Sequence, residues 1–395
     1  MTKRFASAGL IVIMSLCCAN VYAQSSTNLN GSSSTFVTTA VPFLRISPDA
    51  RSGAMGDAGI AISPDANAQY WNVAKIPFCD KPYGVSVSYT PWLKDLVPDI
   101  FLAYISGYAR FGKDSSQAVS GSMRYFSLGN INYTDINANS IGTGMPREYS
   151  FDLGYSRKLS PYLSTGLSLR YIHSAILSGI SNQPGIDYRP GNAFGADLGV
   201  FYTKTHEVTD ERTNTFNFGA IVSNIGSKIS YNSTRKDFIP MNLGIGAAYT
   251  MQFDAYNKLT ITMDFNKLLV PNLTSPDTQV SVVSGIFSSF SDAPGGASGE
   301  LKQIDISTGL EYWYQNQFAI RAGYFYENPS NGDRQYITCG IGAKYNIFTL
   351  NASYLVPEGS GITRNPLSNT VRFTLMFEFY KLEKASEGTP ESTTE

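Results

Sequence analysis

The sequence predicts an all-β protein: a 14-stranded antiparallel β-barrel that spans a membrane, with an N-terminal plug of short helices. Three observations support this fold class. Charged residues are scarce, segments of about ten residues alternate apolar and polar side chains from residue 83 onward, and the connections between these segments are alternately short and long. Alternation with a period of two, repeated many times, is typical of membrane strands.

The composition favours a surface that faces lipid. Only 15% of the 395 residues are charged and 13% are aromatic, with 25 Tyr and 35 Gly, whereas about a quarter of the residues in an ordinary globular domain are charged. Without residues 1–23, the chain has 28 basic and 31 acidic residues. This balance gives no electrostatic basis for binding nucleic acid.

Residues 1–23 are predicted to be a secretory signal peptide. Lys3 and Arg4 precede an apolar core, and Val21-Tyr22-Ala23 forms a small-residue cleavage site before Gln24. Beyond it no run of about 18 apolar residues could form a membrane helix. Passage through a membrane must therefore use strands that close into a barrel.

Residues 24–80 are predicted to plug the lumen. Ser-Pro-Asp-Ala occurs at 47–50 and again at 63–66, and each copy should start a short helix, with the serine hydroxyl as cap. The segment is too apolar in part to sit in water. Arg45 and Arg51 are expected to meet inward carboxylates such as Asp152 or Glu311. The plug residues singled out are Phe43, Leu44, Arg45, Asp49, Arg51, Asp65, Trp71 and Asn72.

The barrel is predicted over residues 81–380. Tyr149, Phe151, Leu153 and Tyr155 alternate with small or polar residues, which gives one apolar and one polar face. The predicted strands cover 83–91, 99–111, 117–128, 147–158, 161–175, 193–203, 214–223, 240–252, 257–267, 303–315, 317–327, 335–345, 347–356 and 369–380.

The connections predict the orientation. Those after even-numbered strands are mostly short, and those after odd-numbered strands are mostly long, up to the connection 268–302. In bacterial barrels short turns lie in the periplasm and long loops outside. Both termini should then be periplasmic, and the polar residues 381–395 should form a disordered periplasmic tail.

Two outer loops carry apolar side chains. In the longest loop Ser275-Pro276-Asp277 should start a helix with one apolar stripe, and Trp92 begins a second patch in the first loop. These segments either lid the barrel or dock another protein. The residues concerned are Val280, Val283, Ile286, Phe287 and Phe290 in the longest loop, and Trp92, Leu93, Leu96 and Val97 in the first.

The sequence offers no catalytic or metal-binding set. The two histidines, His173 and His206, are expected at opposite ends of the barrel, and the mature cysteines, Cys79 and Cys339, are expected as free thiols. We therefore expect no enzyme activity and no cofactor.

A family resemblance rests on FLRISPDARSGAMGDAGIA, residues 43–61, and on Tyr70-Trp71-Asn72-Val73-Ala74-Lys75. These motifs resemble the PorV subfamily of FadL-type outer-membrane barrels, which belongs to the type IX secretion system of Bacteroidetes. The resemblance implies an integral protein of the cell outer membrane that binds the C-terminal signal domain of cargo proteins. It also implies association with the translocon barrel and delivery of cargo to a surface attachment complex with a sortase-like member.

The alternative is a FadL-like transporter of hydrophobic small molecules. FadL-like proteins usually have Asn-Pro-Ala where this chain has Asn72-Val73-Ala74. A transporter would also need a movable plug and a greasy binding pocket. The missing proline makes this alternative weaker than the secretion hypothesis.

Overall fold

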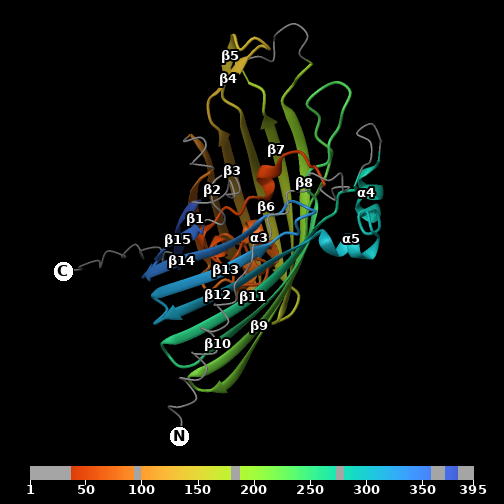
Figure 1. The fold of residues 1–395 in the computed structure, drawn as a ribbon. Helices are drawn as coiled ribbons and strands as arrows, with labels where there is room; N and C mark the ends of the chain where they lie inside the picture. The colour runs from red at the N-terminus through yellow and green to blue at the C-terminus, as the bar shows by residue number, and fades with distance from the viewer. Residues whose placement is uncertain (1–36, 93–98, 179–186, 273–279, 357–369, 381–395) are drawn as a thin grey trace, which may run out of the picture.

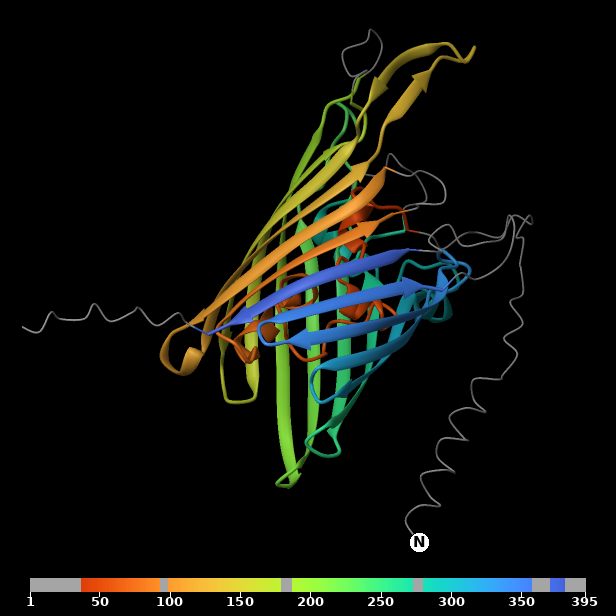
Figure 2. The same ribbon diagram turned by 90° about the vertical axis from the view of Figure 1, so that its left-hand side faces the viewer.

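A computed structural model describes residues 37–92, 99–178, 187–272, 280–356 and 370–380. Fourteen antiparallel strands form a closed barrel in which β1 pairs with β16 (Figures 1 and 2). The predicted fold class is confirmed. The strands are β1 (Tyr83–Pro91), β2 (Ile100–Phe111), β3 (Gln117–Leu128), β6 (Arg147–Lys158), β7 (Leu163–Ala175), β8 (Gly191–Thr209), β9 (Arg212–Gly226), β10 (Asn242–Gln252), β11 (Asn257–Leu268), β12 (Ile304–Tyr314), β13 (Phe318–Tyr326), β14 (Gln335–Tyr345), β15 (Phe348–Leu355) and β16 (Val371–Phe379).

The two faces of each strand differ as the sequence alternation predicts. In β1 the side chains of Val85, Val87 and Tyr89 point outward and are 36–48% exposed, whereas those of Ser86 and Ser88 point into the lumen and are at most 2% exposed. An apolar exterior with a polar interior is the arrangement of a barrel in lipid. Within the described residues, no helix is long and apolar enough to cross a membrane.

Two strands extend further than predicted. β8 and β9 continue into what the sequence suggested was a ten-residue turn, 204–213, and only Asp210 and Glu211 separate them. Residues 204–211 are exposed whichever way they point. The hairpin end therefore has no buried face, and the alternation that reveals a strand is lost there.

A small hairpin inside the long loop 129–146 was not predicted. β4 (Ile131–Thr134) and β5 (Ser140–Gly144) form a separate two-stranded sheet that projects beyond the barrel (Figure 1). Its strands are short and largely exposed. They therefore lack the length and periodicity that identified the barrel strands.

The N-terminal segment lies inside the barrel, as the red to orange ribbon in Figures 1 and 2 shows. It contains the 3₁₀ helices η1 (Pro42–Arg45) and η2 (Val73–Phe78) and the short helices α2 (Ala50–Gly53) and α3 (Ala68–Trp71). Ala40 donates its backbone N–H to Phe238 O in the long connection between β9 and β10. At the other end Phe78 lies against Phe201, their ring centroids 5.8 Å apart, near the short turns. The segment thus runs the length of the lumen.

The helix starts differ from the prediction that serines act as caps. The side chain of Asp49 caps α2 by accepting from Ser52 N at 2.8 Å. α3 begins only at Ala68 and has no side-chain cap. The hydroxyl of Ser63, the expected cap, instead accepts from Arg51 at 2.7 Å, and the Asp65 carboxylate accepts from Arg51 and from the N–H of Asn67. Tertiary contacts have therefore replaced the local capping that the repeated motif suggested.

The remaining helices lie in the connections. η3 (Lys113–Ser115) forms the turn between β2 and β3, and α4 (Val282–Ser288) and α5 (Ala297–Lys302) lie in the longest loop, between β11 and β12. Figure 1 shows α4 and α5 on the outside of the barrel wall. The prediction of a helix start at Ser275 falls on residues outside the described part, and α4 is capped by Ser281.

Candidate functional site

Two regions are candidates for function: the filled lumen and the rim formed by the long loops, which is called the outer rim after its predicted side of the membrane. In the lumen, Arg51 of α2 is the main link between plug and wall. It donates to Glu311 of β12 at 2.8 Å and 2.9 Å, and to Asp65 within the plug at 2.9 Å. Arg321 of β13 donates to the same Glu311 at 2.7 Å. All four side chains are largely buried, so removing one of them would leave a neighbouring charge unpaired in a place that water does not reach.

The second arginine of the plug pairs with a residue that the sequence did not suggest. Arg45 donates to Asp305 of β12 at 2.6 Å. Asp152, one of the carboxylates expected to receive a plug arginine, instead pairs with Arg170 on the neighbouring strand β7. Arg170 also donates to Asp197 at 2.9 Å. The alternation showed that Asp152 points inward, but the pairing depends on barrel geometry that local sequence does not contain.

Asp49, Trp71 and Asn72 lock the turns of the plug together. Trp71 Nε1 donates to Asp49 Oδ1 at 2.6 Å, which joins α3 to the start of α2. Asn72 caps η2 by accepting from Ala74 N at 3.1 Å, and it donates to Val200 O of β8 at 3.0 Å. The short helices are therefore held by side-chain contacts, since four-residue helices have little stability of their own.

The outer part of the plug is apolar. Phe43 and Leu44 are buried with Phe238, Ile239 and other side chains from the outer ends of the strands and loops. Arg124 of β3 is fully buried beside them and donates to Leu44 O at 2.8 Å. This cluster closes the lumen on the side of the long loops.

One buried lysine in the plug lacks a carboxylate within hydrogen-bonding distance among the described residues. Lys75 is 1% exposed and its ammonium donates to Gly59 O at 2.7 Å. Burial lowers the pKa of Lys75 to about 8, although the charge of Asp65 acts in the opposite direction. The charged form of Lys75 is therefore less favourable in the folded protein than in water, although it still predominates at pH 7.

Glycines in the wall make room for the plug. A Cβ on Gly323 of β13 would lie within 2.5 Å of the Met55 Cα and closer still to Gly56 N. A Cβ on Gly309 of β12 would lie 2.8 Å from Met55 O, and one on Gly219 of β9 would lie 2.7 Å from Ile60 O. The plug backbone thus touches the wall where no larger residue fits.

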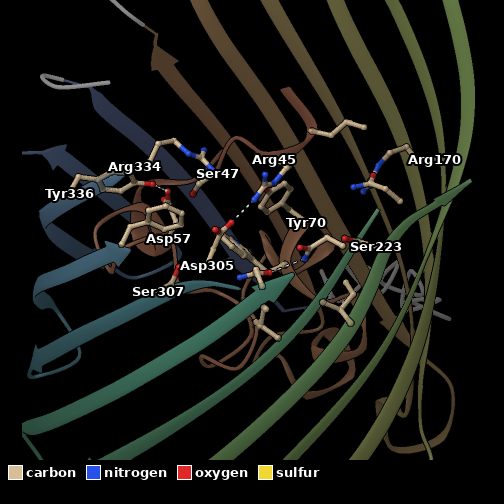
Figure 3. A pocket seen from close by; sticks show the side chains of 18 residues that line it. Arg45, Ser47, Asp57, Tyr70, Arg170, Ser223, Asp305, Ser307, Arg334 and Tyr336 are labelled. Carbon is tan, nitrogen blue, oxygen red and sulfur yellow. Dashed lines mark hydrogen bonds and ion pairs between the residues drawn. The ribbon is translucent and has the colours of Figure 1, made fainter. Parts of the chain in front are cut away.

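A small cavity remains between plug and wall (Figure 3). Its volume is about 110 Å³, and charged side chains such as Arg45 and Asp305 line it together with apolar ones such as Ile60 and Phe325. Sites for small organic ligands usually have about 300–1,000 Å³ and mostly apolar walls. This cavity has room for a few water molecules and is too small for a typical hydrophobic substrate.

At the outer rim, some residues of the predicted apolar stripe are packed against the protein and others are exposed. Val280 and Ile286 pack against the apolar cluster under the loops, together with Trp92 of the first loop. Val283 is 65% exposed and Phe287 73% exposed, so both project away from the protein. Phe290 is also exposed but lines a groove on the barrel exterior. Leu93, Leu96 and Val97 lie outside the described residues.

The residues considered for catalysis lie far from each other. His173 near the outer end of β7 stacks on Tyr149 and contacts Asn192 Oδ1 at 2.8 Å, whereas His206 is in the projecting end of β8. Cys79 is buried, Cys339 is exposed, and both are free. Across the described ranges no group of three or more His, Cys, Asp or Glu side chains could hold a metal ion.

Comparison with known proteins gives one family. The model described as "Type IX secretion system protein PorV" matches residues 30–275, which include both signature motifs. No curated protein sequence matches the chain.

The similar solved structures include two toluene transporters and a FadL homologue. They include the toluene transporter TodX of P. putida, at TM-score 0.47 and 12% identity over 84% of this chain and 98% of that chain. The Ralstonia pickettii toluene transporter TbuX has TM-score 0.44 and 9% identity over 84% and 98%. A Pseudomonas aeruginosa FadL homologue has TM-score 0.42 and 12% identity over 88% and 100%. These values are too low to assign a shared activity.

Proposed function

This chain belongs to the PorV family of type IX secretion system proteins, and we propose that it carries secreted proteins between machines of the outer membrane rather than passing a solute. In this proposal it binds the C-terminal signal domain of cargo and associates with the translocon barrel. It then delivers cargo to the surface attachment complex, whose sortase-like member acts on it. The chain itself performs no catalytic step and needs no cofactor.

The observation that carries the proposal is the fixed plug. Buried ion pairs such as Arg51 with Glu311 tie it to the wall, and glycines such as Gly323 accept its backbone without a gap. A plug held in this way does not suit the repeated opening that a channel needs. The lumen is then unavailable for transport, and partners can be met only at the surface.

We place the partner-binding surface at the outer rim, on the exposed side chains Val283 and Phe287 of α4. Exposed apolar side chains in water favour a protein partner that covers them. Val280, Ile286 and Trp92 would support this surface from below, because they pack against the apolar cluster under the loops. The periplasmic end would carry the C-terminal end of β16. The first described residues, near Ala40, lie at the opposite end, among the long loops.

The FadL-like transporter is the second candidate function. It would require a large apolar binding site in the lumen, but the cavity there is small and several charged side chains lie in its wall. A strain that lacks the gene separates the two candidates. The secretion proposal expects cargo bearing the C-terminal signal to disappear from the cell surface, whereas uptake of long-chain lipids should be unchanged.

The binding surface is tested by the double variant Val283→Ser/Phe287→Ser. The matched control is Leu159→Ser, an exposed apolar residue in the short turn at the other end of the barrel. Tagged protein is purified from solubilised outer membrane, and co-purifying cargo and translocon are measured. We expect a loss of cargo or translocon in the double variant only. Equal recovery from both variants would show that α4 is not the contact.

A further inference from the structure

A groove on the outside of the barrel lies between the wall and the segment that contains α4 and α5. It has a volume of about 490 Å³. Leu243 and Ile245 of β10 and Phe265 of β11 form its wall side, and Phe290 and Leu301 form the opposite side. It is separate from the lumen cavity, which lies on the other side of the wall.

Polar contacts hold this groove open. Lys267 of β11 donates to Glu300 Oε2 at 2.8 Å and to Gln303 Oε1 at 2.6 Å, which fixes α5 to the end of the strand. Glu300 also accepts from Ala293 N at 2.8 Å, and Asp292 accepts from Asn272 N at 2.9 Å. Two apolar surfaces are thus kept at a distance by a rigid frame instead of collapsing onto each other.

The groove lies at the outer edge of the lipid-facing band. The outward side chains of β11 are Leu259, Ile261, Met263 and Phe265, and the next outward residue is the charged Lys267. The change from apolar to charged marks the level where hydrocarbon gives way to head groups. The wall of the groove is therefore continuous with the surface that already contacts lipid.

We propose that this lateral groove binds the hydrocarbon chain of a lipid in the outer leaflet. An open groove with apolar walls is unfavourable in water, and its position gives a lipid chain direct access from the bilayer. The polar end of the lipid would lie near the Lys267–Glu300 pair. A bound chain would support the segment of α4 and α5 from beneath, with Val283 and Phe287 facing away from it.

The test uses the full chain in bilayer nanodiscs with a phosphatidylethanolamine whose acyl chain carries a diazirine. After exchange into detergent and illumination, labelled peptides are mapped by mass spectrometry. The groove variant is Phe290→Ser/Leu301→Ser. The matched control is Ile341→Ser/Leu350→Ser, which changes two exposed apolar residues on β14 and β15. Heat-modifiable gel mobility verifies that both variants remain closed barrels.

We expect the lipid to remain in the groove during detergent exchange. In the wild type and the control, illumination should then give strong label in the peptides that contain Phe265 and Leu301. In the groove variant it should fall about tenfold, the change that accompanies about 1.4 kcal/mol of lost binding free energy. Equal label in all three proteins would mean ordinary surrounding lipid and overturn the proposal. Cross-linking of a protein segment into the groove of the native complex, in place of lipid, would overturn it as well.

Discussion

The substitution Gly323→Ala tests whether the plug is built into the wall. The added Cβ would lie within 2.5 Å of the Met55 Cα and closer to Gly56 N. Both are backbone atoms, so no side chain can rotate away to make room. The turn at Met55 and Gly56 must move, and overpacking of this kind costs about 1–3 kcal/mol. Gly56 itself has a positive φ of 65°, which leaves this turn few alternative conformations.

The matched control is Gly195→Ala on β8. This glycine also faces the interior, but its added Cβ would meet only Asn224 and Ile239 at an ordinary 3.6 Å. Alanine there should be neutral, or stabilising by about 0.4–1 kcal/mol through the unfolded chain. The two variants therefore differ in whether the plug is displaced, while the chemical change is the same.

Two measurements decide the outcome. Denaturant unfolding in vesicles should show a lower free energy of unfolding for Gly323→Ala than for Gly195→Ala. Planar-bilayer recordings should show ion leakage through Gly323→Ala only, because a displaced turn opens a path beside the plug. If the two variants were equally stable and equally silent, the close seating of the plug inferred from the wall glycines would be wrong.

Three further predictions concern the polar contacts of the plug. Arg51→Met should lower the free energy of unfolding by about 3–5 kcal/mol. The double variant Arg51→Met/Glu311→Gln should lose less free energy than the sum of the losses in the two single variants. Strict additivity in this double-mutant cycle would contradict a direct pair. Because the pKa of Lys75 falls from 10.5 to about 8 on folding, the unfolded chain binds more protons between these values, so stability should rise with pH across this window. The free energy of unfolding, taken relative to that of Lys75→Met, should rise by about 3 kcal/mol across this window. A difference between the two proteins that stays constant with pH would refute the lowered pKa of Lys75. Asp49→Ala should lose about 1–3 kcal/mol through two unpaired donors, Ser52 N and Trp71 Nε1. Asp49→Asn should lose less, because its amide oxygen can still cap Ser52 N. Denaturant unfolding measures both variants, and equal losses would argue against capping.

The barrel strands could be predicted because the alternation that identifies them is a local property of the sequence. Each wall residue faces either lipid or lumen, so side chains such as Val85 and Ser86 record the strand in their alternation. Where a strand leaves the wall, as β8 does after Thr203, both faces meet solvent and the signal ends. The even strand number and the alternating connection lengths followed from the same rule.

The contacts inside the lumen could be predicted only in part. Glu311 was one of the inward carboxylates expected to receive a plug arginine, and Arg51 donates to it from 260 positions away. Which arginine meets which carboxylate depends on the register of every strand between them. Asp152 shows the limit: its inward direction was evident from alternation, but its partner Arg170 lies on the adjacent strand. The plug itself was predicted from its place before the first strand and from its apolar residues, which are local features of the sequence.

The contacts between plug and wall have a consequence for how the molecule is assembled. The glycines that accept the plug lie on strands from β6 to β14, whereas the seam that closes the ring joins β1 to β16. Because these glycines leave the plug backbone little room to slide along the lumen, we expect the ring to close around a plug that is already in place. We expect plug and barrel to unfold in a single cooperative transition, so that no stable, empty ring exists along the way.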